Sequence, residues 1–297
     1  MKHHRHPGSY LALIAWSIVC IFPIYWAGIS SIKPPGEFIG PPHYLPFVDF
    51  APSLAAWNHI LFEAYGEVPL RFLNSIVVAT VGTAICLAAG SLAAYPLARS
   101  VWGTEGRSGA RWLLIAILGT RILPPVVVVL PLYYLANASG LFDTRLLLAL
   151  VYASVNLPIA IWLMTGFFRD IPVDIEESAM LDGASRLRIF FTLVLPIARV
   201  GLVAAFVLIF LMSWNEYFIA TYLTADHAMT MPPYLASQMT TREQMAAAEP
   251  DDYARLGVVI VLMFLPALLF VGLIQATLLR VAGADRRRQD QVAARRA

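Results

Sequence analysis

The sequence carries little charge for its length. Of its 297 residues, 13% are charged and 59% are hydrophobic, whereas a soluble globular domain has about 25% charged residues. The apolar residues gather in runs of about 20, the length that a helix needs to cross a bilayer. This composition excludes a soluble domain. It predicts an all-α, polytopic membrane protein, because lipid offers no partner for open backbone groups.

Lysine, cysteine and the usual catalytic motifs are scarce or missing. The two lysines, Lys2 and Lys33, do not complete the Gly-Lys-Ser/Thr loop that cradles a nucleotide. Cys20 and Cys86 lie inside apolar runs, so we expect no disulfide framework. HExxH, CxxC and nucleophile-elbow patterns do not occur either. We therefore expect no catalytic site, cofactor or metal in this chain, and any ATP hydrolysis has to occur on a partner.

Six apolar stretches are long enough to span a membrane as helices. They cover Tyr10–Ile32, Phe72–Tyr95, Trp112–Leu135, Leu146–Phe168, Val200–Leu223 and Ala254–Arg280. Prolines inside these stretches each remove a backbone donor and are expected to kink their helices. They are Pro23, Pro124, Pro125, Pro131, Pro158 and Pro266.

Basic residues concentrate on one set of alternate connections between the spans. The connections after the second and fourth spans begin near Arg99 and Arg169, whereas the long first connection is acidic. Lys and Arg remain cytoplasmic, so both termini are predicted to face the cytoplasm. We expect a cytoplasmic tail at 1–9, a first span and periplasmic connector at 10–70, a five-helix domain at 71–280 and a tail at 281–297. The run Arg286–Arg288 is interpreted as an inner flank of the last span and not as a nucleic-acid site.

Two segments on the outer side exceed a simple turn, Lys33–Arg71 and Thr224–Tyr253. The first is rich in Pro, Gly and aromatic residues, which favours a folded connector over a flexible tether. Long structured loops are usually functional. We therefore predict that both segments dock a partner outside the cell.

The longest polar interruption on the basic side is Asp170–Gly201. Pro172 is typical of the first turn of a helix, and Gly183 is placed to end that helix in a left-handed conformation. A second short helix is predicted over Ser185–Leu195, ended by Pro196. A projection of this kind is suited to binding a partner protein. The alternative is an amphipathic hairpin that rests on lipid headgroups.

Polar and aromatic side chains inside the spans are candidates for a solute pathway. They are Arg121, Asn156, Trp214, Asn215 and Glu216. Arg121 lies ten residues past Arg111, which places it about 15 Å deep at 1.5 Å per residue. Ionisable groups at such depth usually face a cavity or a partner, and an aromatic ring can stack on a sugar. The alternatives are hydrogen bonds between helices and an interfacial aromatic belt.

Several short motifs follow one another between about residues 71 and 280. In the inner segment they are Glu177-Ser178-Ala179, Asp182-Gly183-Ala184 and Leu195-Pro196. Elsewhere they are Arg121-Ile122-Leu123-Pro124-Pro125, Pro131-Leu132-Tyr133, Gly166-Phe167-Phe168-Arg169-Asp170-Ile171-Pro172 and Ser213-Trp214-Asn215-Glu216. The first group resembles the EAA motif of permease subunits in bacterial ABC importers. The second group resembles the maltose-type, carbohydrate-uptake branch of these binding-protein-dependent permeases.

The resemblance implies a type I ABC importer permease fold with six helices and a cytoplasmic coupling helix at about 172–184. It implies four kinds of partner: a second homologous permease subunit, an ATPase dimer that binds ATP and Mg²⁺, a periplasmic or extracellular solute-binding protein, and the lipid bilayer. The residues it assigns to ATPase coupling are Glu176, Glu177, Ser178, Ala179, Asp182, Gly183, Ala184 and Pro196. Ser178 replaces the usual first Ala of the motif. Val200 stands where a second proline often follows, so we expect a weaker kink at the start of the fifth span.

The sequence therefore predicts the permease subunit of an ATP-driven, binding-protein-dependent importer in the bacterial inner membrane. The solute is expected to be a sugar or sugar-like molecule, with saccharides, glycosides, polyols and glycerol phosphate all open. One alternative is a secondary transporter or channel that works alone on an ion gradient. Another is a membrane assembly factor that does not transport.

Overall fold

The computed structural model describes residues 7–38, 42–63, 67–100, 107–239 and 252–272. Within them the regular secondary structure is helical, apart from one isolated β-bridge between Pro46 and Phe50. The chain divides into two compact units. The larger holds residues 71–234, and the smaller combines 1–70 with 235–297. Most of both predicted tails, at 1–6 and 281–297, lies outside the described residues.

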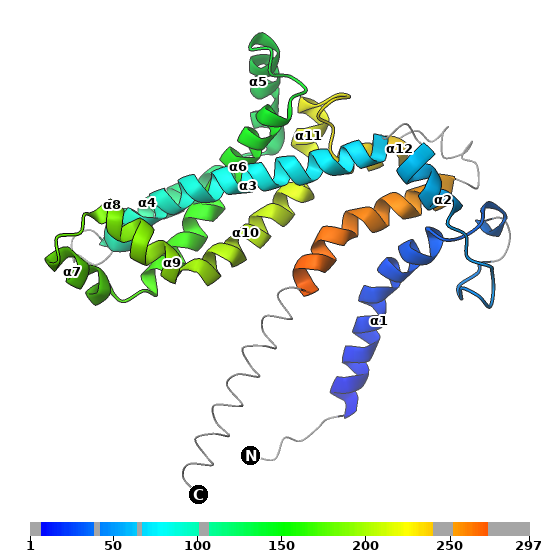
Figure 1. Ribbon diagram of the computed structural model, residues 1–297, viewed down its shortest axis with the longest axis horizontal. Helices are drawn as coiled ribbons and strands as arrows, with labels where there is room; N and C mark the ends of the chain where they lie inside the picture. The colour runs from blue at the N-terminus through cyan, green and yellow to red at the C-terminus, as the bar shows by residue number, and fades with distance from the viewer. Residues whose placement is uncertain (1–6, 39–41, 64–66, 101–106, 240–251, 273–297) are drawn as a thin grey trace, which may run out of the picture. The chain divides into compact units, whose positions relative to one another are not determined.

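The larger unit is a bundle of long helices with short helical insertions (Figure 1). Its main elements are α3 (Glu67–Ser100), α4 (Arg107–Gly119), η3 (Thr120–Ile122), α5 (Pro125–Ala138), α6 (Arg145–Arg169), α10 (Arg199–Trp214), α11 (Phe218–Leu223) and α12 (Met231–Met239). Small residues let α3 and α6 approach closely. A Cβ added to Gly90 would lie 2.6 Å from the Cβ of Ala160, which is the close contact that small residues permit between membrane helices.

Two of the six predicted spans are interrupted. The third is not one helix: α4–η3 and α5 meet at 78°. Leu123 and Pro124 are extended there (ψ 127° and 136°), because a residue that precedes proline is pushed out of the helical region. The fifth also divides, since α10 ends at Trp214 and α11 starts at Phe218. By length and composition, the described residues hold four helices able to cross a membrane, or up to six if each bent pair is one span.

The smaller unit contains α1 (Pro7–Ser30), η1 (Pro35–Phe38), α2 (Ala55–Asn58), η2 (His59–Glu63) and a last helix, Asp252–Gly272. The last helix contacts the end of α1, where a Cβ on Gly257 would lie 2.7 Å from the backbone nitrogen of Ser31. The predicted continuation of this span to Arg280 lies outside the described residues.

The connector after α1 is folded around a buried lysine. Lys33 is 4% exposed, and its Nζ lies 4.5 Å from the ring centroid of Trp26 and 5.5 Å from that of Phe50. Burial lowers the pKa of Lys33, although the nearby carboxylates of Glu37 and Asp49 oppose that effect. This cation–π arrangement confirms the prediction of a folded connector for its described part.

Candidate functional site

The inner polar segment forms the predicted helix–glycine–helix projection. Its first helix, α7 (Val173–Leu181), begins directly after Pro172. Gly183 has φ +83°, and its N–H donates to the Met180 carbonyl at 3.0 Å, while the Ala184 N–H donates to the Ala179 carbonyl at 3.0 Å. This pair of bonds is a Schellman cap. The start and the end of the first helix are therefore confirmed.

The second helix differs from the prediction at its end. It continues from α8 (Arg186–Ile189) through a wide π turn, η4 (Phe190–Val194), into α9 (Leu195–Ile197). Pro196 does not end it, because a wide turn before a proline relieves the clash with the preceding carbonyl. The chain bends by 76° only between α9 and α10, where Ala198 has ψ 6°. The entry to α10 is therefore bent even though Val200 replaces the second proline of the motif, and a kink weaker than that of other permeases stays a prediction.

One face of α7 is held against the rest of the larger unit by a buried carboxylate. Glu176 is 4% exposed, forms an ion pair with Arg99 near the end of α3, and accepts a hydrogen bond from the Tyr95 hydroxyl at 2.7 Å. Arg99 also donates to the Ile171 carbonyl at 3.5 Å. We call Tyr95, Arg99 and Glu176 the α3–α7 clamp. It ties two elements that are about 80 residues apart in the sequence.

Aromatic rings surround the clamp and exclude water from it. The Tyr95 ring lies 5.2 Å from that of Phe190 and 6.2 Å from that of Phe168, measured between centroids. Phe168 and Phe190 are both buried, and their ring centroids are 6.0 Å apart. The clamp therefore joins the ends of α3 and α6 to the start of η4 in one apolar cluster.

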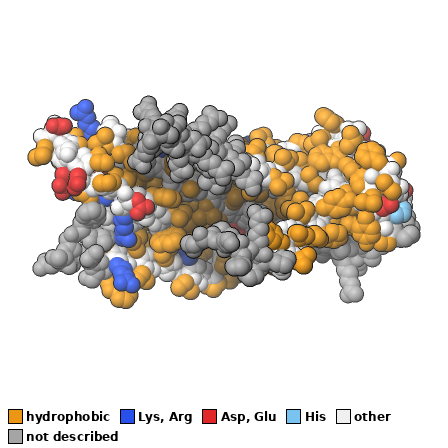
Figure 2. Space-filling view, turned by 90° about the horizontal axis from the view of Figure 1, so that it is seen from below, with side chains coloured by type: hydrophobic (Ala, Val, Ile, Leu, Met, Phe, Trp, Pro, Cys, Tyr) orange, Lys and Arg blue, Asp and Glu red, His pale blue; other side chains and the backbone are white. Residues whose placement is uncertain are grey.

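The opposite face of α7 is exposed. It carries Glu177, Ser178, Asp182 and Gly183. Leu181 is 90% exposed, while Ala179 and Ala184 are half-buried. Figure 2 shows acidic and basic side chains gathered at the end of the molecule where α7 and α8 lie in Figure 1. α7 therefore buries one face and exposes the other, which carries charged side chains and Leu181.

A second group of polar side chains meets inside the bundle. Arg121 donates to the Val155 carbonyl at 2.8 Å and to the Asn156 side-chain oxygen at 3.1 Å. The Asn156 amide in turn donates to the Ser213 hydroxyl at 3.1 Å. This chain of bonds links η3, α6 and α10. Arg121 and Asn156 also line a cavity of about 680 Å³ that Tyr152 and Glu216 share.

Glu216 caps the start of α11 in addition to lining that cavity. Its carboxylate accepts from the Ile219 N–H at 2.9 Å, the Ala220 N–H at 3.0 Å and the Tyr152 hydroxyl at 3.1 Å. A carboxylate on the free N–H groups of a helix start is a stabilising cap. Glu216 therefore holds α11 in place after the break at the end of α10.

The two other predicted pathway residues lie apart from this cavity. Trp214 is 1% exposed, with its ring stacked on Phe210 and edge-on to Phe72 at centroid distances of 6.0 and 5.5 Å. Asn215 is exposed and donates to the Leu211 carbonyl at 2.8 Å. The structure thus brings together Arg121, Asn156 and Glu216, and buries the tryptophan in the protein interior.

Sequence reasoning overlooked Tyr95, Arg99, Tyr152 and Ser213. Arg99 contributed only to the orientation argument. Tyr95 and Tyr152 lie in apolar helices with no motif around them, and Ser213 entered only as the first residue of the Ser213-Trp214-Asn215-Glu216 motif. The one available signal was Glu176, an acid next to a predicted docking residue, which requires a partner if that face of the helix is buried.

At the other end of the larger unit, one carboxylate fixes the chain after α11. Asp143 accepts from four successive N–H groups, those of Ala225, Asp226, His227 and Ala228, at 2.9–3.1 Å. Burial alone would raise the pKa of Asp143, but these donors outweigh burial and hold the pKa below its ordinary value. Of the predicted outer segment 224–253, residues 240–251 lie outside the described residues.

Residues near the N-terminal end of α3 anchor the same loop. The Asn74 amide donates to the carbonyls of His227 and Met229 at 2.9 and 2.8 Å, and Arg71 donates to the Asp226 carbonyl. The loop at 225–231 is therefore rigid, while Asp226 and His227 remain exposed.

The comparisons with known proteins agree with this architecture. The chain is 31% identical over 93% of its length to the diacetylchitobiose uptake system permease protein of Streptomyces coelicolor, of which it covers 86%. It is 30% identical over 90% of its length to the trehalose transport system permease protein of Mycobacterium tuberculosis, of which it covers 93%. A chain of a bacterial ABC transporter involved in the import of the acidic polysaccharide alginate has the same fold, with a TM-score of 0.74, 22% identity and coverage of 91% of this chain and 94% of that one.

Permeases of this kind are membrane subunits, and ATP is hydrolysed by separate subunits. The family model of inner membrane components matches residues 87–281, which include α7, the C-terminal part of α3 and the whole of α6 and α10. The chain is therefore a multi-pass membrane protein that belongs to the family of inner membrane components of binding-protein-dependent transport systems.

Proposed function

We propose that this chain is one of two similar permease subunits in an importer for a saccharide, glycoside or polyol. The diacetylchitobiose and trehalose permeases, which it resembles over most of its length, support this solute class. The charge asymmetry of the loops supports a cytoplasmic position for both termini and for α7. ATP and Mg²⁺ then bind to a pair of ATPase subunits, a solute-binding protein delivers the solute outside, and this chain itself binds no cofactor.

The observation that carries the proposal is the two-sided construction of α7. Its outer face, with Glu177, Asp182 and the fully accessible Leu181, is free to enter a cleft of the ATPase subunit. Its inner face is held by Glu176 through the α3–α7 clamp. Gly183 sets the sharp turn that lets α7 project, since its positive φ suits glycine.

A displacement of α7 is transmitted to three membrane helices. α7 follows α6 after a connection of three residues, 170–172, and the clamp ties it to α3. Breaking a buried ion pair costs on the order of 3–5 kcal/mol, so α3 moves with α7 instead of separating from it. The helix that contains Pro196 and the bend at Ala198 carry the motion into α10.

The cavity at Arg121 and Asn156 is the proposed contact of this subunit with the solute. Hydroxyl-rich solutes need donors and acceptors in fixed positions, and the cavity offers a guanidinium, an amide, a tyrosine hydroxyl and the Glu216 carboxylate. The loop at 225–231 is one proposed dock for the solute-binding protein, and the connector after α1 is another. The first is held by the half-buried carboxylate of Asp143 and the second by the buried Lys33.

The proposal is tested with the assembled importer in lipid vesicles, by measuring uptake of labelled sugars and ATP hydrolysis stimulated by the loaded binding protein. Replacing Glu177 and Leu181 together by Ala removes the outer-face anchors of α7. Truncating an interface anchor costs about 1.4 kcal/mol or more, so both rates are expected to fall about tenfold or more. Arg188→Gln, on the exposed surface of α8, is the matched control.

Normal stimulation and uptake in the double variant would refute the coupling role of α7. The solute class is tested separately, by offering disaccharides, polyols and amino acids to the binding protein and to the vesicles. Stimulation by amino acids alone would refute the carbohydrate assignment and leave the coupling role intact.

A further inference from the structure

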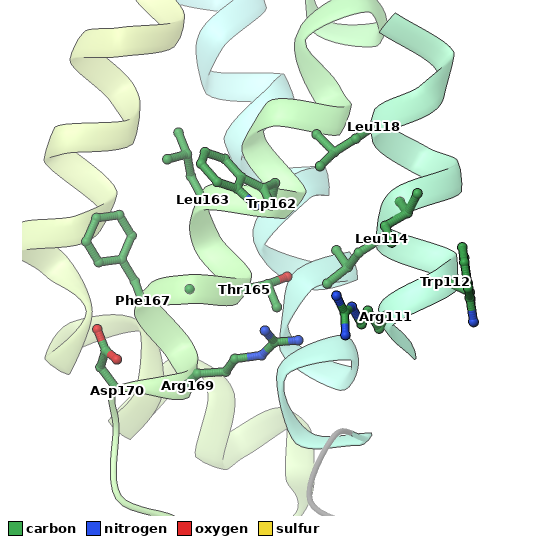
Figure 3. A pocket seen from close by; sticks show the side chains of 12 residues that line it. Arg111, Trp112, Leu114, Leu118, Trp162, Leu163, Thr165, Phe167, Arg169 and Asp170 are labelled. Atoms are coloured by element: carbon green, nitrogen blue, oxygen red, sulfur yellow. The ribbon is translucent and has the colours of Figure 1, made fainter. Parts of the chain in front are cut away.

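A groove of about 1120 Å³ lies between α4 and α6, at the end of the bundle that leads into α7. Its walls are mostly apolar, with Leu114, Leu118 and Trp162 among them, and Figure 3 shows these side chains on the two facing helices. Trp112 and Trp162 are 68% and 53% exposed. Apolar side chains left uncovered on a membrane-spanning helix contact lipid or another membrane helix.

Two arginines close the end of this groove. Figure 3 shows Arg111 from α4 and Arg169 from α6 with their guanidinium groups pointing toward one another across it. Within the described part of the chain neither guanidinium has an ion-pair or hydrogen-bond partner. Asp170 belongs to the lining, but its carboxylate points away from both arginines (Figure 3). Two like charges that converge without an acid between them create a site for an anion.

The occupant has to satisfy both parts of the groove. A soluble phosphate would neutralise the arginines but leave the leucine and tryptophan walls in contact with water. An apolar helix of another subunit would cover the walls but leave two cations uncompensated, which is costly once they are desolvated. A phospholipid with an anionic headgroup matches both, and tryptophan is typical of the headgroup level.

We propose that the groove between α4 and α6 binds an anionic glycerophospholipid, with its phosphate between Arg111 and Arg169 and an acyl chain along Leu114, Leu118 and Trp162. Basic pockets between membrane helices bind anionic lipids in this way. The site is separate from the coupling face of α7 and from the cavity at Arg121, so it stands or falls independently of the transport proposal.

The first test is native mass spectrometry of the assembled importer with equal amounts of phosphatidylglycerol and phosphatidylcholine. Each basic residue near an anionic surface contributes a factor of roughly 5, so two arginines give a preference of roughly 30-fold for phosphatidylglycerol. Arg111→Gln combined with Arg169→Gln is expected to abolish this preference. Arg186→Gln combined with Arg188→Gln makes the same charge change on α8 and is expected to retain it.

Equal retention of the two lipids by the unmodified importer would overturn the proposal, as would an unchanged preference in the Arg111/Arg169 variant. So would an efficient disulfide between a Leu118→Cys variant and a cysteine on the other permease subunit, because a protein would then cover the groove.

A second measurement tests the site in the unmodified importer. Brominated acyl chains quench tryptophan, so brominated phosphatidylglycerol is expected to quench more than brominated phosphatidylcholine at equal mole fraction. Replacement of Trp112 and Trp162 by Phe is expected to remove this difference and thereby assign it to the groove. Inorganic phosphate in millimolar excess is expected to leave the quenching unchanged. Displacement by phosphate alone would identify a soluble anion as the ligand and overturn the lipid assignment.

Discussion

Removal of the Glu176 carboxylate is expected to uncouple ATP hydrolysis from transport. In Glu176→Ala, Arg99 loses its ion pair and Tyr95 loses its hydrogen-bond acceptor. Water cannot readily replace them, because the side chains of Arg99 and Glu176 are only 11% and 5% exposed. Breaking such a pair by removing one partner costs on the order of 3–5 kcal/mol, and the Tyr95 hydrogen bond adds about 1 kcal/mol. Since nothing else in the clamp neutralises Arg99, we expect α7 to detach from α3.

The assay compares two rates in vesicles that contain the assembled importer. The outer face of α7 still binds the ATPase subunits in this variant, so basal ATP hydrolysis is expected to continue. Its stimulation by loaded binding protein and the uptake of solute are both expected to fall. The signature of the clamp is therefore a lower number of solute molecules imported per ATP.

A compensated variant separates attachment from charge. Glu176→Met combined with Arg99→Met replaces the ion pair by apolar side chains of similar length, and such replacements are often neutral or stabilising. Uptake per ATP is expected to recover in this double variant, because the two helices are again held together. Unchanged coupling in Glu176→Ala, or equal losses of basal and stimulated hydrolysis, would refute the reasoning.

Two further predictions concern helix packing and the outer loop. Gly90→Val forces a side chain into the contact with Ala160 and is expected to lower the free energy of unfolding by about 1–3 kcal/mol. The Tm of the purified importer measures this effect. Gly119→Ala is the control, because a Cβ at Gly119 meets nothing within 4 Å. Asp143→Asn weakens four charge-assisted bonds, so hydrogen exchange at residues 225–228 is expected to accelerate. Because folding lowers the pKa of Asp143, its stabilisation is complete above about pH 4 and is lost as the pH falls through the folded value. Equal protection of residues 225–228 in Asp143→Asn and in the unmodified importer at about pH 7 would contradict this account.

The membrane class, the helix–glycine–helix projection and the folded connector were predictable because their signals are local. A run of about 20 apolar residues needs no tertiary partner to indicate a span. Pro172 and Gly183 act within a few residues of themselves, through a fixed φ and a permitted positive φ. The short motifs around Asp182-Gly183-Ala184 likewise predicted the family through their resemblance, because a motif is recognised from the order of its residues alone.

The bends were only partly predictable. Proline pairs such as Pro124-Pro125 predict that a helix is kinked but not by what angle. The observed angle of 78° depends on how α5 packs after the kink. At the start of α10, the bend lies at Ala198 and follows a π turn, and no local signal in the sequence indicated that position. The direction of a chain after a break is set by the surface on which the next helix packs.

Which side chains meet was decided by the tertiary structure. Glu176 and Glu177 are adjacent and chemically alike in the sequence, yet one is buried against Arg99 and the other faces solvent. The fold likewise placed Trp214 in the core and made Glu216 the cap of α11. Sequence alone determined how each segment is built. Contacts between distant segments determined which residues form the clamp, the cavity and the groove, because burial and ion pairing depend on neighbours that are far away in the chain.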